Sequence, residues 1–233
     1  MTTKSVALHD APAVVAWLKR NATKATRDGM ARFALPSDHA LGVTMSQLRT
    51  LAKLTGRNHA LAADLWSTGI YEARMLAALI DDPAAVTSAQ MDRWCKDFDN
   101  WGIADTVCFA LFDRTEHRWS KVPQWAARTP EFEKRAAFAL LWSLTVHDKA
   151  APDAHYIAGL ALIEREATDE RHFVKKAINM ALRAVGKRNR ALNSAAVTTA
   201  KTLAASDNTH AQWIGRDALR ELQGPVVARR IAR

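Results

Sequence analysis

The sequence is poor in the residues on which several protein classes depend. It has two cysteines, Cys95 and Cys108, too few for a disulfide scaffold and without the spacing of a zinc site. We interpret them as core or near-surface thiols in a reducing cytoplasm. No apolar run is long enough to span a membrane, and the stretch MTTKSVALHDAPAVVAWLKR lacks the apolar segment of a signal peptide. We therefore expect a cytoplasmic protein without membrane contact.

Aromatic residues and cofactor signatures are also scarce. Aromatics make up 7% of the chain, yet eight of them are tryptophans and two are tyrosines. The eight histidines show no ligand spacing, and the chain has no glycine-rich phosphate loop and no Ser-His-Asp order. We expect neither a metal nor an organic cofactor. Six tryptophans are expected to pack in the core between helices: Trp17, Trp66, Trp94, Trp119, Trp142 and Trp213.

What the chain has in abundance is helical periodicity. No segment alternates with a period of two, whereas apolar residues recur at helical spacing throughout. The pattern predicts about a dozen mostly short helices, the first of which runs from about Ala11 through APAVVAWLKRNATKATRDGMARF. Pairs recur roughly every 30 to 45 residues, which is typical of helical-hairpin repeats. We predict an all-α fold, an α-solenoid of HEAT-like antiparallel helix pairs, with a compact irregular bundle as the alternative.

No linker divides the sequence, so we expect a single curved domain over residues 1–233 with a concave basic face. The net charge is +9, and the excess is confined to one region. Residues 171–233 hold 13 of the 33 Lys and Arg but only 3 of the 24 Asp and Glu. This segregation favours a polyanionic partner, most commonly nucleic acid, over a merely solvated basic surface.

One of the expected helices carries an aspartate on its apolar side. In DFDNWGIADTVCFALF, Asp99 or Asn100 is the expected N-cap, and the helix runs to about Phe112. Helical spacing places Trp101 and Asp105 on one face among apolar residues. Such a carboxylate is either a buried structural aspartate that accepts hydrogen bonds from a neighbouring helix, or a fixed anion beside an aromatic wall. The second arrangement suits a reaction that develops positive charge.

Five segments resemble one family of DNA-repair enzymes. DNWGIAD is similar to the Trp-Asp-x-x-Asp signature of the bacterial DNA alkylation-repair glycosylases built from HEAT-like repeats. Over roughly residues 29 to 222, the family's other segments resemble GMARFALPSDHALGVTMSQLRTLAK, LWSTGIYEARMLAALI, EKRAAFALL and HFVKKAINMALRAVGK, in the expected order.

The resemblance implies an activity. These enzymes hydrolyse the N-glycosidic bond of cationic N3- and N7-alkylated purines in duplex DNA. It also implies that Asp105 stabilises an oxocarbenium-like sugar and positions water, that Trp101 packs against the deoxyribose, and that Arg135 belongs to the DNA-facing site. From spacing alone, Arg135 could instead pair with Glu131 on its own helix. We expect a monomer that acts on alkylated duplex DNA at the bacterial nucleoid.

Two positions depart from the family pattern. Gly102 follows Trp101 where the signature usually has Asp, and Met180 replaces a second Trp that completes the aromatic cleft. Methionine is apolar but has no π-face to support a cation. A weakly active or non-catalytic DNA-binding scaffold is therefore the alternative to an enzyme, and a protein–protein adaptor is a third hypothesis.

A basic helical stretch completes the expected DNA-binding surface, to which we also assign Met180. Phosphate contact is one interpretation of these side chains, and an ordinary solvated face is the other. The six cations are Lys175, Lys176, Arg183, Lys187, Arg188 and Arg190.

Overall fold

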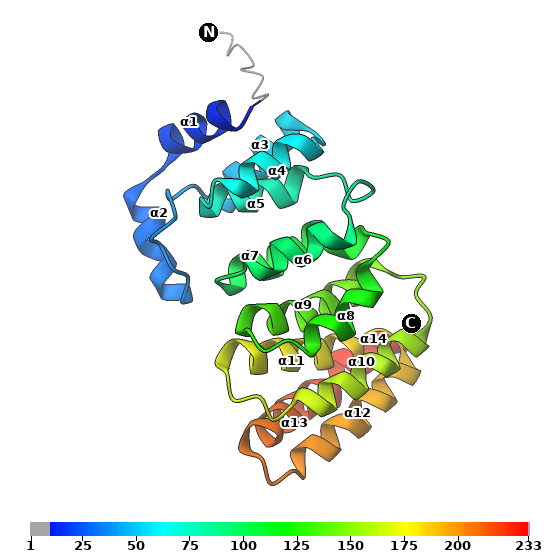
Figure 1. Ribbon diagram of the computed structural model, residues 1–233. Coiled ribbons are helices and arrows are strands. Elements are labelled where there is room, and N and C mark those ends of the chain that lie inside the picture. Colours follow the sequence, from blue (N-terminus) through cyan, green and yellow to red (C-terminus); the bar gives the residue numbers. More distant parts are fainter. Residues whose placement is uncertain (1–9, 233) are drawn as a thin grey trace. The chain divides into compact units, whose positions relative to one another are not determined.

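A computed structural model describes residues 10–232, and over these residues the chain forms helices and no strand (Figure 1). Residues 10–232 form fourteen α-helices and two short 3₁₀ helices, which confirms the all-α prediction. The contacts divide the chain into two compact units, one that ends at Met91 and one that begins at Asp92. The expectation of one domain over residues 1–233 stays a prediction.

In its described part, residues 10–91, the first unit contains five complete α-helices and one 3₁₀ helix. These are α1 (Ala11–Asn21), α2 (Lys24–Gly29), η1 (Met30–Phe33), α3 (Met45–Thr55), α4 (His59–Ser67) and α5 (Tyr71–Ile80). The long first helix expected from the sequence is wrong, because the backbone of Ala22 is extended and Thr23 caps a new helix by accepting from the Thr26 amide. Threonine is a favoured N-cap residue, and its side chain replaces the missing helical hydrogen bond here.

A tight turn in the first unit is built around a buried carboxylate. Glu72 on α5 is 1% exposed and accepts hydrogen bonds from the backbone amides of Leu41, Gly42 and Val43. The φ angle of Gly42 is +99°, and a Cβ there would lie 2.2 Å from the carbonyl oxygen of Thr23. The turn therefore requires glycine, and the three amides satisfy a charge that would otherwise be costly to bury.

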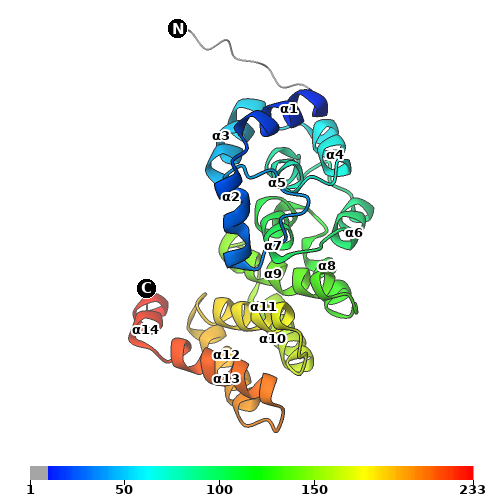
Figure 2. The same cartoon turned by 90° about the vertical axis from the view of Figure 1, so that its left-hand side faces the viewer.

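Helix α6 (Ser88–Lys96) crosses the boundary, and the rest of the second unit is a two-layer stack (Figures 1 and 2). Helices α7, α9, α11 and α13 pack consecutively in one layer, and α8, α10 and α12 pack in the other. Their bounds are α7 (Trp101–Ala110), η2 (Phe112–Arg114), α8 (Arg118–Ala126), α9 (Glu131–His147), α10 (Asp153–Glu166), α11 (His172–Val185), α12 (Arg190–Ala204), α13 (Thr209–Leu222) and α14 (Pro225–Ile231). The stack places the expected site residues of α7, α9 and α11 in the same layer.

The core of the second unit is apolar and includes both cysteines. Cys95 and Cys108 are fully buried, and burial raises the pKa of both thiols. Trp125 and Phe112 are also fully buried and pack ring against ring at 5.8 Å. No helix within residues 10–232 has the length and apolar character needed to cross a membrane.

Candidate functional site

The first residue of helix α7 decides which face of the helix carries Trp101 and Asp105. The Asn100 side chain accepts a hydrogen bond from the Ile103 amide at 3.0 Å, which makes Asn100 the N-cap and Trp101 the first helical residue. Asp105 follows one turn later on the same face. Its side chain is 15% exposed, so it is partly buried but still open to solvent.

Arg135 on α9 holds the Asp105 carboxylate at two points. Its Nε donates to Oδ1 at 2.9 Å and its Nη2 donates to Oδ2 at 2.7 Å. This two-point geometry is stronger and more directional than a single charged hydrogen bond. The Nη1 group donates to the Phe173 carbonyl at 2.7 Å, so Arg135 links α7, α9 and α11. Since Arg135 is 4% exposed, it acts on its surroundings chiefly through these partners.

The alternative pairing of Arg135 with Glu131 is wrong. Glu131 instead accepts a hydrogen bond from the Phe173 amide at 3.2 Å, at the beginning of α11. Asp105 lies thirty residues before Arg135 in sequence, so helical spacing within α9 gave no indication of the pairing.

Burial and the Arg135 guanidinium shift the pKa of Asp105 in opposite directions. Burial raises the pKa of the Asp105 carboxyl, and the Arg135 charge and hydrogen bonds lower it without cancelling the shift. The ionised carboxylate is held in one orientation, and each oxygen keeps lone-pair capacity beyond its bond to Arg135. Such a fixed anion can stabilise a cation that develops beside it and can accept a hydrogen bond from water.

Met180 lies on α11, closer to the C-terminal end of the helix than Phe173, whose carbonyl Arg135 contacts. It comes seven residues after Phe173, which is about 10 Å along the helix axis and on the same helical face. Its side chain is half-buried. The structure thus brings Asp105 and Arg135 into contact, places Trp101 one turn from Asp105, and puts Met180 two turns along a helix that Arg135 touches.

The six cations expected to contact DNA fall into three groups. Lys175 and Lys176 both place their ammonium groups over the Trp213 ring, at 5.1 and 5.0 Å from its centre. Arg183 and Lys187 share Glu221, each at 2.7 Å. Because Glu221 offsets part of their charge, these two are weaker candidates for phosphate contact than the two lysines above Trp213.

The remaining two cations, Arg188 and Arg190, lie at the junction between α11 and α12. Arg188 donates to the backbone carbonyls of Thr145, Asp148 and Lys149, and its guanidinium lies 4.1 Å from the centre of the Tyr156 ring. Arg190 is the first residue of α12 and is exposed.

Trp213 is a surface residue that the sequence did not reveal as one. The sequence pattern assigned it to the core, but it is 36% exposed on α13 beneath Lys175 and Lys176. Two lysines and an accessible indole form a surface suited to a polyanion with stacked bases. Only the packing of α13 against α11 reveals this surface, because its members are about forty residues apart.

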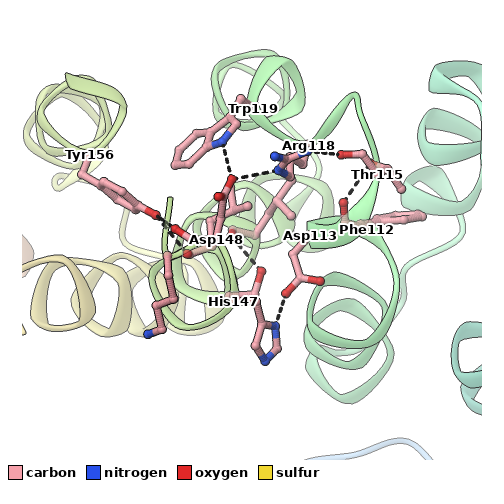
Figure 3. Close-up of polar contacts among 12 residues, drawn as sticks. Phe112, Asp113, Thr115, Arg118, Trp119, His147, Asp148 and Tyr156 are labelled. Carbon is pink, nitrogen blue, oxygen red and sulfur yellow. Dashed lines mark hydrogen bonds and ion pairs between the residues drawn. The ribbon is translucent and has the colours of Figure 1, made fainter. Parts of the chain in front are cut away.

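A second polar network fixes the end of α9 (Figure 3). The Asp148 carboxylate accepts from Arg118 Nε at 2.9 Å and from Trp119 Nε1 at 3.0 Å. Burial opposes ionisation of Asp148, but these hydrogen bonds outweigh it and lower its pKa. Tyr156 donates its hydroxyl to the carbonyl oxygens of Leu144 and Asp148.

Next to this network, Asp113 is buried and pairs with Nδ1 of His147. Burial raises the pKa of Asp113, and the His147 bond opposes the rise. Within residues 10–232, no three His, Cys, Asp or Glu side chains are grouped so as to hold a metal ion.

The helix layers define a helical-repeat protein that carries an arginine-held carboxylate on α7 and a group of basic side chains on α11. The chain belongs to the DNA alkylation repair enzyme family, whose model matches residues 14–222. A comparison with curated protein sequences finds no significant match.

Among solved structures, the chain is similar to a member of "a new family of proteins related to the HEAT-like repeat DNA glycosylases with affinity for branched DNA structures". The TM-score is 0.78 at 21% sequence identity, and the match covers 95% of this chain and 96% of that chain. This likeness confirms the predicted fold, a HEAT-like helical solenoid.

Proposed function

We propose that this protein is a DNA N-glycosylase that removes cationic N3- or N7-alkylated purines from duplex DNA. The observation that carries the proposal is the partly exposed Asp105 carboxylate, held at two points by Arg135 one turn from Trp101. Family membership and the excess of cations in residues 171–233 support DNA as the partner.

In the proposed reaction, the bond between C1′ of the sugar and the alkylated nitrogen breaks. The bonding electrons leave with the base, which departs neutral, and the sugar becomes oxocarbenium-like. Asp105 stabilises that cation and orients a water molecule, whose oxygen bonds to C1′ while its proton passes to the carboxylate or to solvent. Trp101 packs against the deoxyribose, and Arg135 acts as a positioning residue that keeps Asp105 ionised and oriented.

Met180 supports a second candidate, DNA binding without efficient excision. It stands where the family resemblance places a second Trp, and methionine offers a cationic base no aromatic face. The similar solved structure belongs to proteins described as having affinity for branched DNA. In this alternative the chain binds DNA junctions through its basic side chains, and Asp105 is a structural partner of Arg135.

The two candidates are separated by incubating the protein with duplex DNA that carries one N7-methylguanine and measuring abasic sites. We expect excision by the wild type, and a decrease on the order of a hundredfold or more for Asp105→Asn, the loss of one electrostatic catalytic contact. DNA affinity should stay similar or rise, because a charge that repels phosphate is removed. Asp207→Asn is the matched control, since Asp207 is an exposed carboxylate between α12 and α13 and takes no part in the proposed site.

An unchanged rate in Asp105→Asn would show that Asp105 is not the catalytic carboxylate. A wild type that binds branched DNA tightly but excises nothing would favour the second candidate. Met180→Trp tests the same point from the other side, because an added aromatic wall should raise excision of a cationic base.

A further inference from the structure

A polar cavity in the second unit lies apart from the residues of the proposed reaction. It has a volume of about 340 Å³, which is within the range of small-molecule sites. The end of α9, the α11–α12 junction and α14 line it. Four of its lining residues are cations: Lys149, Lys187, Arg188 and Arg230. These positive charges repel one another, and an anion bound in the cavity would offset that repulsion.

Most of this charge has no internal counterion. Lys187 pairs with Glu221, but over residues 10–232 no carboxylate forms an ion pair with Lys149, Arg188 or Arg230. Arg188 donates to neutral carbonyls, and its buried Nε has no hydrogen-bond partner in that part of the chain. Lys149 and Arg230 are therefore available to a ligand, and Arg188 adds its positive charge to the same wall.

Neither of the acidic residues nearest in sequence forms an ion pair with a cation of the cavity among residues 10–232. The Asp148 carboxylate accepts from Arg118 and Trp119 on α8 (Figure 3). The Asp148 carbonyl oxygen accepts a hydrogen bond from Arg188. Asp153 accepts from the Asn189 amide group at 3.0 and 3.1 Å. These hydrogen bonds position the cavity wall, and Lys187 is the one cavity cation with an ion-pair partner among residues 10–232.

Two further features of the wall suit a nucleotide. Asn189 lines the cavity and is the N-cap of α12, a fifteen-residue helix, so the positive end of the helix dipole adds to the cationic charge. Trp142 also lines the cavity and is half-buried, with its ring edge-on to Phe109 at 4.7 Å. An indole on the wall of a basic cavity offers a base a stacking surface.

We propose that this cavity binds the terminal phosphate monoester of a DNA strand, with the end nucleotide against Trp142. An internal phosphodiester carries one charge and continues in both directions, so it suits an open surface better than a cavity. A terminal monoester carries close to two negative charges at neutral pH and ends the chain. The proposal rests on the DNA-binding part of the proposed function and not on base excision.

The test compares two nicked duplexes that differ only in a 5′-phosphate or a 5′-hydroxyl at the nick, with a matching pair for the 3′ end. Binding is measured by fluorescence anisotropy at fixed salt. We expect the wild type to prefer one phosphorylated end by about tenfold, the value of one charge-assisted hydrogen-bond set. Lys149→Gln combined with Arg230→Gln should reduce that ratio to near one.

Lys201→Gln combined with Arg216→Gln is the matched control, because both residues are exposed cations of the same unit outside the cavity lining. It should weaken binding to both ends of a pair equally and leave the ratio unchanged. Free deoxynucleoside 5′-monophosphate should compete with the phosphorylated end for the wild type and not for the cavity variant.

Four results would overturn the proposal. The wild type could bind intact duplex but ignore the terminal phosphate, which contradicts the cavity assignment alone. The cavity variant could keep the wild-type ratio, which places the phosphate elsewhere. Binding of the free nucleotide without preference among strand ends would make the cavity a nucleotide site and not a strand-end site. A wild type that binds no DNA contradicts the proposed function as well, whereas loss of excision alone leaves the ratio intact.

Discussion

At α7 and α9 an arginine is matched by a carboxylate, whereas of the four cations that line the cavity between α9, α11 and α14 only Lys187 pairs with a carboxylate among residues 10–232. Arg135 and Asp105 share two hydrogen bonds, and Arg135 is almost fully buried. Lys149 and Arg230 line a polar cavity without an ion-pair partner among residues 10–232. The first arrangement fixes an anion in place, and the second leaves positive charge for an external anion. Their variants should therefore differ in stability and in binding.

The largest expected difference is in stability. Arg135→Met leaves the Asp105 charge partly buried without its partner, so we expect the free energy of unfolding to fall by about 3 kcal/mol. Lys149→Met removes a cation that has no counterion and should change it by less than about 0.5 kcal/mol. Urea unfolding followed by circular dichroism measures both. Equal losses in the two variants would mean that the Asp105–Arg135 pair contributes no more than a surface charge does.

A smaller difference is expected in the salt dependence of DNA binding, between two pairs of cations on α11 and just after it. Replacing both Lys175 and Lys176 by Gln should flatten the slope of log affinity against log salt by about 1.8 if each neutralises one phosphate. Replacing both Arg183 and Lys187 should change the slope less, because Glu221 already offsets part of their charge. Binding of undamaged duplex at several salt concentrations checks this. Identical slopes for both variants and the wild type would make the basic stretch a solvated face.

The smallest effects concern pH. The Asp105 carboxyl should titrate above the usual aspartate pKa of 3.8 because burial dominates, and Asp148 should titrate below it because Arg118 and Trp119 donate to it. Carbon-detected NMR titration of the two carboxyls measures both directions. Excision that needs ionised Asp105 should weaken as the pH falls through the raised pKa.

The contribution of Asp148 to stability should decrease as the pH falls. Its pKa is lowered in the folded state, so this contribution is present above the unfolded-state pKa and is lost as the pH falls through the folded value. Asp148→Asn should therefore lose less stability than the wild type as the pH falls below the usual aspartate pKa of 3.8. An equal loss would assign the acid sensitivity to other carboxyls.

The sequence by itself determined the class of the fold and the local arrangement on α7. Helical periodicity and short capped turns predicted an all-α stack, because each helix must bury an apolar stripe against a neighbour. An expected N-cap at Asp99 or Asn100, which the structure assigns to Asn100, and i, i+4 spacing placed Trp101 and Asp105 on one face. The same local reasoning failed at Ala22, where an extended residue and a Thr cap divide a pattern that otherwise suits one helix.

The tertiary structure alone decided which charges are matched. Asp105 meets Arg135 thirty residues later, and Arg183 and Lys187 meet Glu221 more than thirty residues later, because α7, α9, α11 and α13 stack in one layer. Stacking also exposes Trp213 beneath two lysines and brings Arg230 to the cavity beside Lys149. Helical spacing relates residues within one helix, whereas an ion pair or a cavity depends on which helices pack together, and that follows from the burial of many apolar side chains at once.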